Sequence, residues 1–534
     1  MILSLLISLA LISLGAYWYS WRRKKMRFFE DLGIPGPKPD LITGNLREYI
    51  NKGFTRCQVE WTNKYGNCVG YFLGIKPILS IGDPDILRDI QVKEFLSFAD
   101  RPPTIPGGQT PVGLASDALI SLKGQSWKRV RNILTPTFSS SKLKQLTQLI
   151  NDAVGILLNK IREKASKRQR FDIYQFYEQI TLDIIGRAAF GIKTNSQTDT
   201  NDFFLINVQQ MLKSSISKTA FIIQLCFPEL LPFFIPFRRL VELIRMWRGN
   251  SPIGQLLEAC AKVVKLRKKS PKEQRIDLLQ LMLDAQMSDE LETFPKSELT
   301  SDNDSQCFKT KLFNENLSDM GQHSISNSEI LANCLLFLLA GYETTCTTLG
   351  FTTHFLVNHP QVQEKLRKEI NSVLEKEKAL DYSSISKLQY LDQVLSEVLR
   401  MYPPVPAFVN RECIRDYRYG TLYIPKGTTV QVPVWALHYN PDYWTEPETF
   451  DPERFSPNES QPTTSMVYQP FGEGPRNCIG KRFALLEMKI IVAQILRYFI
   501  LKPDEKTENE KIMMKEKLFQ IVPRFGVIVS AESV

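Results

Sequence analysis

The sequence FGEGPRNCIG at positions 471–480 places Cys478 inside a turn that glycines interrupt three times. The segment KRFALLEMKIIVAQILRYF follows directly, and its apolar residues recur with helical spacing. Glycine lets a backbone approach a flat ligand and adopt positive φ. The N-terminus of a helix stabilises a thiolate through its dipole and its unpaired N–H groups. We therefore predict that Cys478 is a single-thiolate ligand to a metal.

A second unusual stretch lies in a long predicted helix, which begins at the capping box Ser326 to Glu329 and ends at Pro360. Near its middle the segment AGYETTCTT (340–348) contains a glycine and a cluster of threonines, which are poor choices for a buried helix interior. Such a local conflict indicates a functional site. The small residues at 340–341 predict a groove for a flat ligand, beside the hydroxyl of Thr344 and the carboxyl of Glu343.

Arginines recur near these two stretches. Glu397 and Arg400 are i, i+3 neighbours on a predicted helix and can form an ion pair. Trp127 and Arg131 are spaced i, i+4, so both reach one side of a helix. Three further arginines lie in short motifs: Arg101 in FADRPP, Arg411 in VNREC and Arg454 in FDPERF.

These motifs resemble those of the cytochrome P450 family. The segment 471–480 fills every fixed position of the FxxGxRxCxG haem-binding signature, and AGYETT is similar to the acid–alcohol motif for oxygen activation. The ExxR pair with FDPERF, and WxxxR, also match family motifs, so the likeness spans nearly the whole chain. Within the family it is to microsomal members, and it looks closest to the animal group of drug-metabolising and thromboxane-synthase-like enzymes.

The resemblance implies a role for each of these residues. Cys478 is then the proximal ligand of haem iron, Glu343 a proton source and Thr344 its alcohol partner. Glu397, Arg400 and Arg454 form a structural triad that holds the cysteine loop. The remaining matched positions make the haem cradle: Arg101, Trp127, Arg131, Arg411, Phe471, Arg476 and Gly480.

The implied fold is mainly α, the cytochrome P450 fold, with a large helical domain and a small β-rich lobe. The implied cofactors are haem b (iron protoporphyrin IX) and NADPH, whose electrons arrive through a membrane-bound reductase. The reaction is monooxygenation: one atom of O2 enters a lipophilic substrate and the other leaves as water. Expected partners are NADPH-cytochrome P450 reductase, with cytochrome b5 as a further candidate, and a lipophilic small molecule that is xenobiotic, steroid or fatty-acid-like.

Composition excludes several other classes. The 534 residues carry a net charge of +10, which favours anionic membranes or acidic partners. Compact basic runs with interleaved aromatic residues are missing, so no nucleic-acid partner is expected. Nine cysteines without a CxxC pair indicate free thiols in a reducing compartment. Four histidines without an HExxH arrangement argue against a zinc hydrolase.

Residues 1–21 carry no charge and are long enough to cross a bilayer, and the cluster RRKK follows at once. Charge after the apolar stretch, together with aromatic residues at its end, favours an uncleaved transmembrane anchor over a cleaved signal peptide. The positive-inside rule then predicts a single-pass protein of the endoplasmic reticulum membrane with its catalytic domain on the cytoplasmic side. Residues 22–39 are a predicted basic and proline-rich hinge, and residues 40–534 the haem-binding domain.

Two further segments of the globule stand out. Residues 286–325 are polar and aperiodic, which predicts a long surface loop or a partly disordered insertion. Residues 220–237 are very apolar but broken by prolines, so they form either buried loops and short helices or a membrane-dipping patch beside a ligand entrance. Basic residues near the haem-cradle motifs are candidates for docking the reductase: Lys128, Arg129, Lys481 and Arg482. Residues expected to flank the haem and set selectivity are Val405, Ala407 and Phe408.

Two other functions remain open at this point. A haem-thiolate isomerase of lipid endoperoxides needs neither reductase nor proton delivery, and the presence of Glu343 and Thr344 argues against it. The second alternative is a non-enzymatic haem or lipid binder anchored on the membrane. The presence of the oxygen-activation motif argues against it, because a binding protein does not require that motif. Turnover of an endoperoxide without NADPH distinguishes the first alternative, and failure to consume NADPH with any lipophile distinguishes the second.

Overall fold

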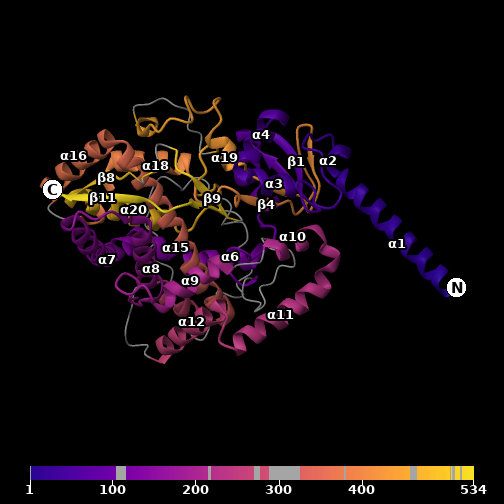
Figure 1. Ribbon diagram of the computed structural model, residues 1–534, viewed down its shortest axis with the longest axis horizontal. Helices are drawn as coiled ribbons and strands as arrows, with labels where there is room; N and C mark the ends of the chain where they lie inside the picture. The colour runs from indigo at the N-terminus through magenta and orange to yellow at the C-terminus, as the bar shows by residue number, and fades with distance from the viewer. Residues whose placement is uncertain are drawn as a thin grey trace, which may run out of the picture.

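The computed structural model describes residues 2–103, 116–214, 218–269, 277–287, 325–377, 380–457, 466–505, 507, 511–517 and 520–534. Figure 1 shows a helical body from which α1 (Ile2–Met26) projects, with the N-terminus at its far end. A small sheet lies near the base of α1, and the C-terminus lies at the opposite side of the body.

Helices make up most of the body. Those before the long polar segment are α2 (Phe28–Asp31), α3 (Leu46–Lys52), α4 (Phe54–Tyr65), α5 (Pro84–Arg88), α6 (Gly124–Leu134), α7 (Ser140–Ser166), α8 (Ile173–Phe190), α9 (Phe203–Ser214), α10 (Lys218–Cys226), α11 (Leu231–Trp247), α12 (Pro252–Lys269) and α13 (Leu278–Met287). Those after it are α15 (Asn327–Asn358), α16 (Pro360–Glu377), α17 (Tyr382–Ser386), α18 (Gln389–Met401), α19 (Val434–His438) and α20 (Lys481–Tyr498). Short π and 3-10 turns are η1 (Asp89–Lys93), η2 (Phe95–Ser97), η4 (Thr135–Phe138), η5 (Pro228–Leu230) and η6 (Pro452–Phe455).

The largest described sheet has the order β1-β2-β7-β4, formed by β1 (Cys68–Leu73), β2 (Lys76–Ile81), β7 (Thr429–Gln431) and β4 (Asn410–Glu412). Only the β2–β7 pair within it is parallel. A second sheet joins β3 (Phe171–Asp172), β11 (Ile528–Ser533) and β8 (Phe499–Pro503). Two hairpin pairs complete the β structure: β9 (Met514–Glu516) with β10 (Ile521–Pro523), and β5 (Tyr417–Tyr419) with β6 (Leu422–Ile424).

Helix α15 runs through the centre of the helical body, packed against α8 (Figure 1). It begins where the sequence predicts, because the Ser326 side chain accepts from the Glu329 N–H and the Glu329 carboxylate accepts from the Ser326 N–H. The helix is apolar enough to cross a membrane, but two thirds of its most apolar window is buried inside the protein. It is therefore the core helix of the fold, whereas the most apolar window of α1 is entirely exposed and only its end, at Arg22 and Met26, is buried against the body.

The predicted architecture, mainly α with a small β-rich lobe, is confirmed. The small sheet expected between residues 60 and 85 is present as β1 and β2. Helix α1 continues through the basic cluster to Met26, and the boundaries at 21 and 39 stay predictions. Most of the predicted insertion at 286–325 lies outside the described residues.

Helix α11 and the turn η5 resolve the two alternatives for the apolar, proline-rich segment 220–237. The helix passes through Pro236, and none of its residues is buried. The α10 end of the segment is different, since Leu225 and Cys226 are buried there. The segment is thus a buried helix end followed by an exposed apolar helix.

Candidate functional site

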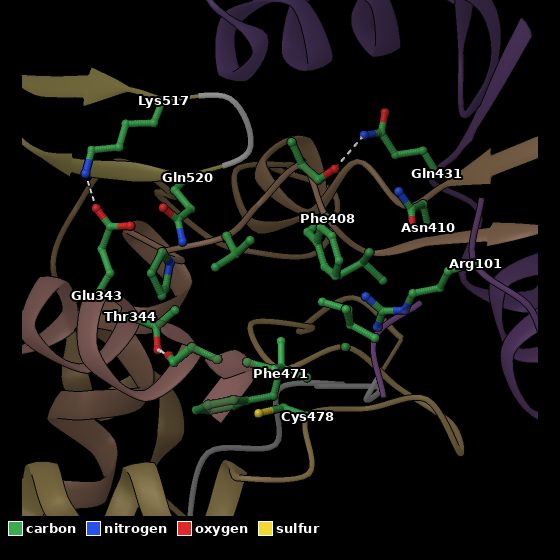
Figure 2. A pocket seen from close by; sticks show the side chains of 18 of the residues that line it. Arg101, Glu343, Thr344, Phe408, Asn410, Gln431, Phe471, Cys478, Lys517 and Gln520 are labelled. Carbon is green, nitrogen blue, oxygen red and sulfur yellow. Dashed lines mark hydrogen bonds and ion pairs between the residues drawn. The ribbon is translucent and has the colours of Figure 1, made fainter. Parts of the chain in front are cut away.

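A single large cavity of about 1,970 Å³ brings the predicted site residues together (Figure 2). Ligand pockets in proteins are usually about 300–1,000 Å³, so this cavity is roughly twice the upper end of that range. Its walls come from the 471–480 loop, the middle of α15, the segment 404–411, the β1-β2-β7 sheet and the β9–β10 hairpin. Among the described residues that line it, Cys478 is the only cysteine.

The cysteine loop turns sharply toward the cavity. The Cys478 N–H donates to the Phe471 carbonyl at 2.9 Å, and Gly474 has a φ of +73°. A Cβ at Gly474 would lie 2.0 Å from the Gln91 carbonyl oxygen, so only glycine fits there. The Cys478 side chain is exposed to the cavity interior, as Figure 2 shows, while Gly480 caps the N-terminus of α20.

Burial raises the pKa of the Cys478 thiol, and the Gly480 N–H, Arg131, Arg101 and Lys481 act in the opposite direction. The backbone N–H at the start of α20 therefore lowers the pKa of the thiol, as predicted, but burial raises the pKa by more. A cation bonded to the sulfur removes that cost. The loop is thus suited to a thiolate that is bound to a metal.

The predicted cradle arginines converge on the same cavity. The Arg101 guanidinium donates to the Arg476 carbonyl at 3.1 Å, and Arg131 donates to the carbonyl and side-chain oxygens of Asn477. Burial lowers the pKa of Arg101 to about 10 and that of Arg476 to about 9. Burial and then repulsion from Arg101 and Arg476 hold the pKa of Arg411 well below its usual range. Binding of an anion would therefore stabilise the charged form of this arginine cluster.

Among the described residues only one carboxylate comes within ion-pair distance of these arginines. Asp100 approaches Arg476 at 3.7 Å, and the Nε of buried Arg411 has no hydrogen-bond partner. Arg476 itself is held by the carbonyls of Ala99 and Leu122, both at 2.7 Å, and lies over the Trp127 ring at 4.2 Å. Trp127 and Arg131 both line the cavity from α6, as their spacing predicts.

Helix α15 forms another wall of the cavity. Ala340 lies exposed to it, and the Thr344 hydroxyl donates to the Ala340 carbonyl at 2.7 Å. Gly341 lines the cavity next to Ala340, as the predicted groove requires. A Cβ at Gly341 would also lie 2.8 Å from Ile185 of α8, so the missing side chain permits the close approach of α8 to α15 as well.

Glu343 is tied to a residue that the sequence did not single out. Its carboxylate forms an ion pair with Lys517, which follows β9 in the hairpin above the cavity (Figure 2). Glu343 is buried, and its Oε2 has no hydrogen-bond partner. Lys517 thus fixes the carboxyl group next to Thr344 against the β9–β10 hairpin.

Replacing Lys517 with methionine is expected to lower the free energy of unfolding by about 1–2 kcal/mol, since Glu343 then stays buried without its cationic partner. The same replacement in a Glu343→Gln background should cost much less. Urea unfolding of the four proteins measures this coupling, and Lys517→Arg serves as the conservative control. Equal costs in both backgrounds would show that the pair does not hold the hairpin.

Glu397, Arg400 and Arg454 meet in the protein interior, away from the cavity. The Arg400 guanidinium donates to the two Glu397 oxygens at 2.7 and 2.8 Å, and Arg454 Nε lies 3.3 Å from Glu397 Oε1. Glu397 and Arg400 are fully buried. The Asp451 N–H also donates to Glu397, which joins α18 to the segment before η6.

His438 and Gln469 extend this cluster to the cysteine loop, and sequence reasoning missed both. His438 Nδ1 lies 2.8 Å from the Arg400 carbonyl, and the Gln469 N–H donates to His438 Nε2 at 3.0 Å. Burial lowers the pKa of His438 to about 3, so the ring is neutral and makes both bonds. The Gln469 carbonyl accepts from the Gly472 N–H at 3.1 Å, at the start of the loop that carries Cys478.

The four basic residues predicted to face a reductase differ in their surroundings. Arg129 forms an ion pair with Glu329, so it is less available than predicted. Arg482 is exposed and bonds the Ser140 and Tyr382 hydroxyls, and exposed Lys481 lies 5.7 Å from the Phe471 ring centroid. Lys128 is half-buried on α6.

The site fits a flat metal complex that carries its own ligands and its own acid groups. Within the described residues there is no group of three or more His, Cys, Asp or Glu side chains that could hold a bare metal ion. One sulfur faces the cavity, and among the described residues the cluster of buried arginines has one carboxylate within ion-pair distance, that of Asp100 beside Arg476. Iron protoporphyrin IX offers iron for the sulfur and two carboxylates for the arginines. The arrangement is that of a haem-thiolate protein.

Comparison with known proteins agrees with this class. The profile of the family described as Cytochrome P450 matches residues 34–529, so the chain belongs to the cytochrome P450 family. It is 34% identical to cytochrome P450 3A5 of Homo sapiens, over 99% of this chain and 96% of that protein. It is also 34% identical to cytochrome P450 3A13 of Mus musculus, over 92% of this chain and 90% of that protein. The chain is accordingly a monooxygenase whose cofactor is haem b and whose electrons come from NADPH through a reductase.

Proposed function

We propose that this chain is a membrane-anchored monooxygenase that inserts one atom of O2 into lipophilic small molecules at the cavity described above. The observation that carries the proposal is the meeting of Cys478, the arginine cluster and the Glu343–Thr344 pair in one cavity. Haem bound there supplies the iron at which O2 is activated. The protein residues hold the cofactor, exclude bulk water and supply protons.

The proposed roles follow from the geometry. Cys478 ligates the iron, and Arg101, Arg131, Arg411 and Arg476 hold the cofactor's two carboxylates, with Arg476 also bracing the loop before α6. Phe471 and Gly480 position the sulfur from either side of the turn. The Thr344 hydroxyl and the Glu343 carboxyl lie on α15, where they deliver protons to the oxygen side of the site.

Selectivity is proposed to depend on the apolar wall at 404–409. Val405, Ala407 and Phe408 all line the cavity, and the Phe408 ring lies 4.6 Å from the Arg101 guanidinium carbon. A substrate above the haem would thus contact Phe408 and the apolar residues of α8 and α15. Such a wall favours lipophilic substrates, because each buried apolar group adds to binding.

The proposed electron donor is NADPH-cytochrome P450 reductase, with cytochrome b5 as a second candidate. Lys481 and Arg482 are exposed at the start of α20, directly after Cys478. Basic residues at that place favour the approach of an acidic redox protein. Arg129 is not included, since Glu329 already pairs with it.

We further propose that the protein sits on the cytoplasmic side of the endoplasmic reticulum membrane through two contacts. Helix α1 is the anchor, with large apolar residues exposed from Ile2 to Tyr19. Helix α11 is the second contact, because it presents large exposed apolar side chains at positions 233, 237, 240, 244 and 247, which lie on one helix face. Amphipathic helices of this kind lie in the membrane interface. Pro228 and Leu225, next to α11, line the cavity, so the contact adjoins its mouth.

Trp247, which is 86% exposed, tests the second contact. The difference in tryptophan fluorescence between the full-length wild type and Trp247→Phe gives the emission of Trp247. In vesicles that contain brominated phospholipids this difference is expected to disappear, because bromine quenches indoles that lie in the membrane interface. The comparison removes the contributions of Trp18 and Trp21 in α1. A Trp247 component that is unaffected by brominated lipid would place α11 in water.

The proposed activity is tested by reconstituting the full-length holoenzyme with NADPH and a cytochrome P450 reductase, under ¹⁸O2, with a panel of lipophilic compounds. Products that each carry one ¹⁸O atom and form only with NADPH are the expected result. Rearrangement of a lipid endoperoxide without NADPH would overturn it in favour of an isomerase. A fully loaded holoenzyme that consumes no NADPH with any compound would overturn it in favour of a binding protein.

A further inference from the structure

Lys76, the first residue of β2, lies on the sheet face that forms one wall of the cavity. It stands directly opposite Leu73 on β1, and Ile78, two residues further along β2, stands opposite Thr429 on β7. Leu73, Lys76, Ile78 and Thr429 all line the cavity. Because side chains alternate between the two faces of a strand, Lys76 and Ile78 share this face.

The Lys76 ammonium has no carboxylate within ion-pair distance among the described residues. The acid that influences it most is Glu412 on β4, and Glu412 is already paired with Lys123. Burial lowers the pKa of Lys76 to about 8, with Glu412 opposing this effect and Lys123 adding to it. A partly desolvated ammonium in an apolar wall is stabilised by an anion that enters the cavity.

Two unsatisfied polar groups lie on the same wall of the cavity. The Thr429 hydroxyl and the Asn410 side-chain carbonyl are buried and have no hydrogen-bond partner. Asn410 stands on β4 beside β7, and Figure 2 shows its side chain among the residues that line the cavity. Buried polar atoms are usually satisfied. Thr429 stands opposite Ile78, so its unsatisfied hydroxyl indicates a polar portion of a ligand on the part of the wall near Lys76, whereas Asn410 stands opposite Gln431, further along the sheet.

The mouth of the cavity carries positive charge, as Lys76 does. Lys213, Lys515 and Arg524 line the cavity and are exposed at its rim. The two acids that line it among the described residues are both engaged: Glu343 with Lys517, and Glu516 with the Phe54 N–H. A mouth with free positive charge attracts anions and raises their rate of association.

We infer that the cavity accepts lipophilic anions, molecules with a carboxylate or sulfate on an apolar body, and that Lys76 binds the anionic group. Apolar residues next to Lys76, among them Ile75, Ile222 and Leu225, cover the body of such a molecule. This inference rests on the proposed function, because it names the substrate class of the same cavity. The arginine cluster is separate from it, since it surrounds the cysteine loop and serves the cofactor's carboxylates.

Dodecanoate and 1-dodecanol test the inference, because they share an apolar chain and differ in charge. Dissociation constants of the full-length holoenzyme are measured by equilibrium dialysis and, independently, by the haem spin-state shift. Wild type should bind dodecanoate about tenfold more tightly than dodecanol. Lys76→Met should lose that preference and keep its affinity for dodecanol, while Lys76→Arg should retain it.

Lys515→Met is the matched control, because it removes a lysine from the exposed rim of the same cavity. It should change the affinity for dodecanoate less than about twofold, as expected of a screened surface charge. Equal binding of both ligands by the wild type, or an unchanged preference in Lys76→Met, would overturn the inference. Oxidation of dodecanol with NADPH in that case would leave the proposed function intact, whereas a holoenzyme that oxidises no lipophile would contradict the proposed function itself.

Discussion

Replacement of Cys478 with alanine is expected to abolish the thiolate-type spectrum of the reduced CO complex and all NADPH-dependent oxidation. The reason is the position of this sulfur, which is the only cysteine sulfur on the cavity wall among the described residues. The arginine cluster would still attract the cofactor's carboxylates, so some haem should remain bound to the variant. CO difference spectra and haem content measured on the same preparation separate loss of ligation from loss of haem.

Cys68→Ala is the matched control for this variant. Cys68 is half-buried at the start of β1 and does not line the cavity. Its replacement should leave the spectrum unchanged and cost less than about 1.5 kcal/mol of stability. Cys478→His should keep haem but give the spectrum of an imidazole-ligated iron. A thiolate-type spectrum in Cys478→Ala would assign the iron to another cysteine and would refute the site as described.

The parts of the site that could be predicted from sequence are those whose residues all lie within one short segment of the chain. The glycines around Cys478, the capping box at Ser326 and the i, i+3 spacing of Glu397 and Arg400 each follow from local geometry. The same holds for Trp127 and Arg131, whose spacing places both on the cavity side of α6. In these cases the local pattern determines both the element and the direction of the side chain.

The parts that could not be predicted depend on single residues that meet across long separations. Lys517 reaches Glu343 from a hairpin 174 residues away in sequence, and no pattern around Lys517 signals the contact. No local sequence pattern marks His438 and Gln469. Only tertiary packing places them between Arg400 and the cysteine loop. The sequence predicts Gly341 in the cavity wall but does not reveal that Ile185 packs against the same glycine.

The connection from the buried triad to the cysteine loop has a structural consequence. Arg400 donates to the His438 carbonyl at 2.7 Å and accepts from His438 Nδ1 through its own carbonyl, so α18 and α19 are bonded in both directions. His438 then fixes Gln469, and Gln469 fixes the turn before Cys478. Glu397 and Arg400 are therefore connected to the loop that carries Cys478, although neither residue lines the cavity.

Arg400→Leu is expected to lower the free energy of unfolding by about 3–5 kcal/mol, because Glu397 stays buried with only Arg454 and one backbone N–H beside it. Urea unfolding and haem content are measured together. Arg56→Leu is the control: Arg56 pairs with Glu60 on an exposed face of α4, and the loss of such a pair costs less than about 1 kcal/mol.

Arg400→Lys separates stability from positioning. Lysine keeps the charge beside Glu397 but cannot make the two-pronged contact and also reach the His438 carbonyl. This variant should fold and bind haem, yet a larger fraction of its CO complex should lack the thiolate signature, because the turn that carries Cys478 is less firmly held. If Arg400→Lys shows the wild-type spectrum and Arg400→Leu unfolds like Arg56→Leu, then the triad does not hold the cysteine loop, and the loop must be positioned by Arg131 and Asn477 instead.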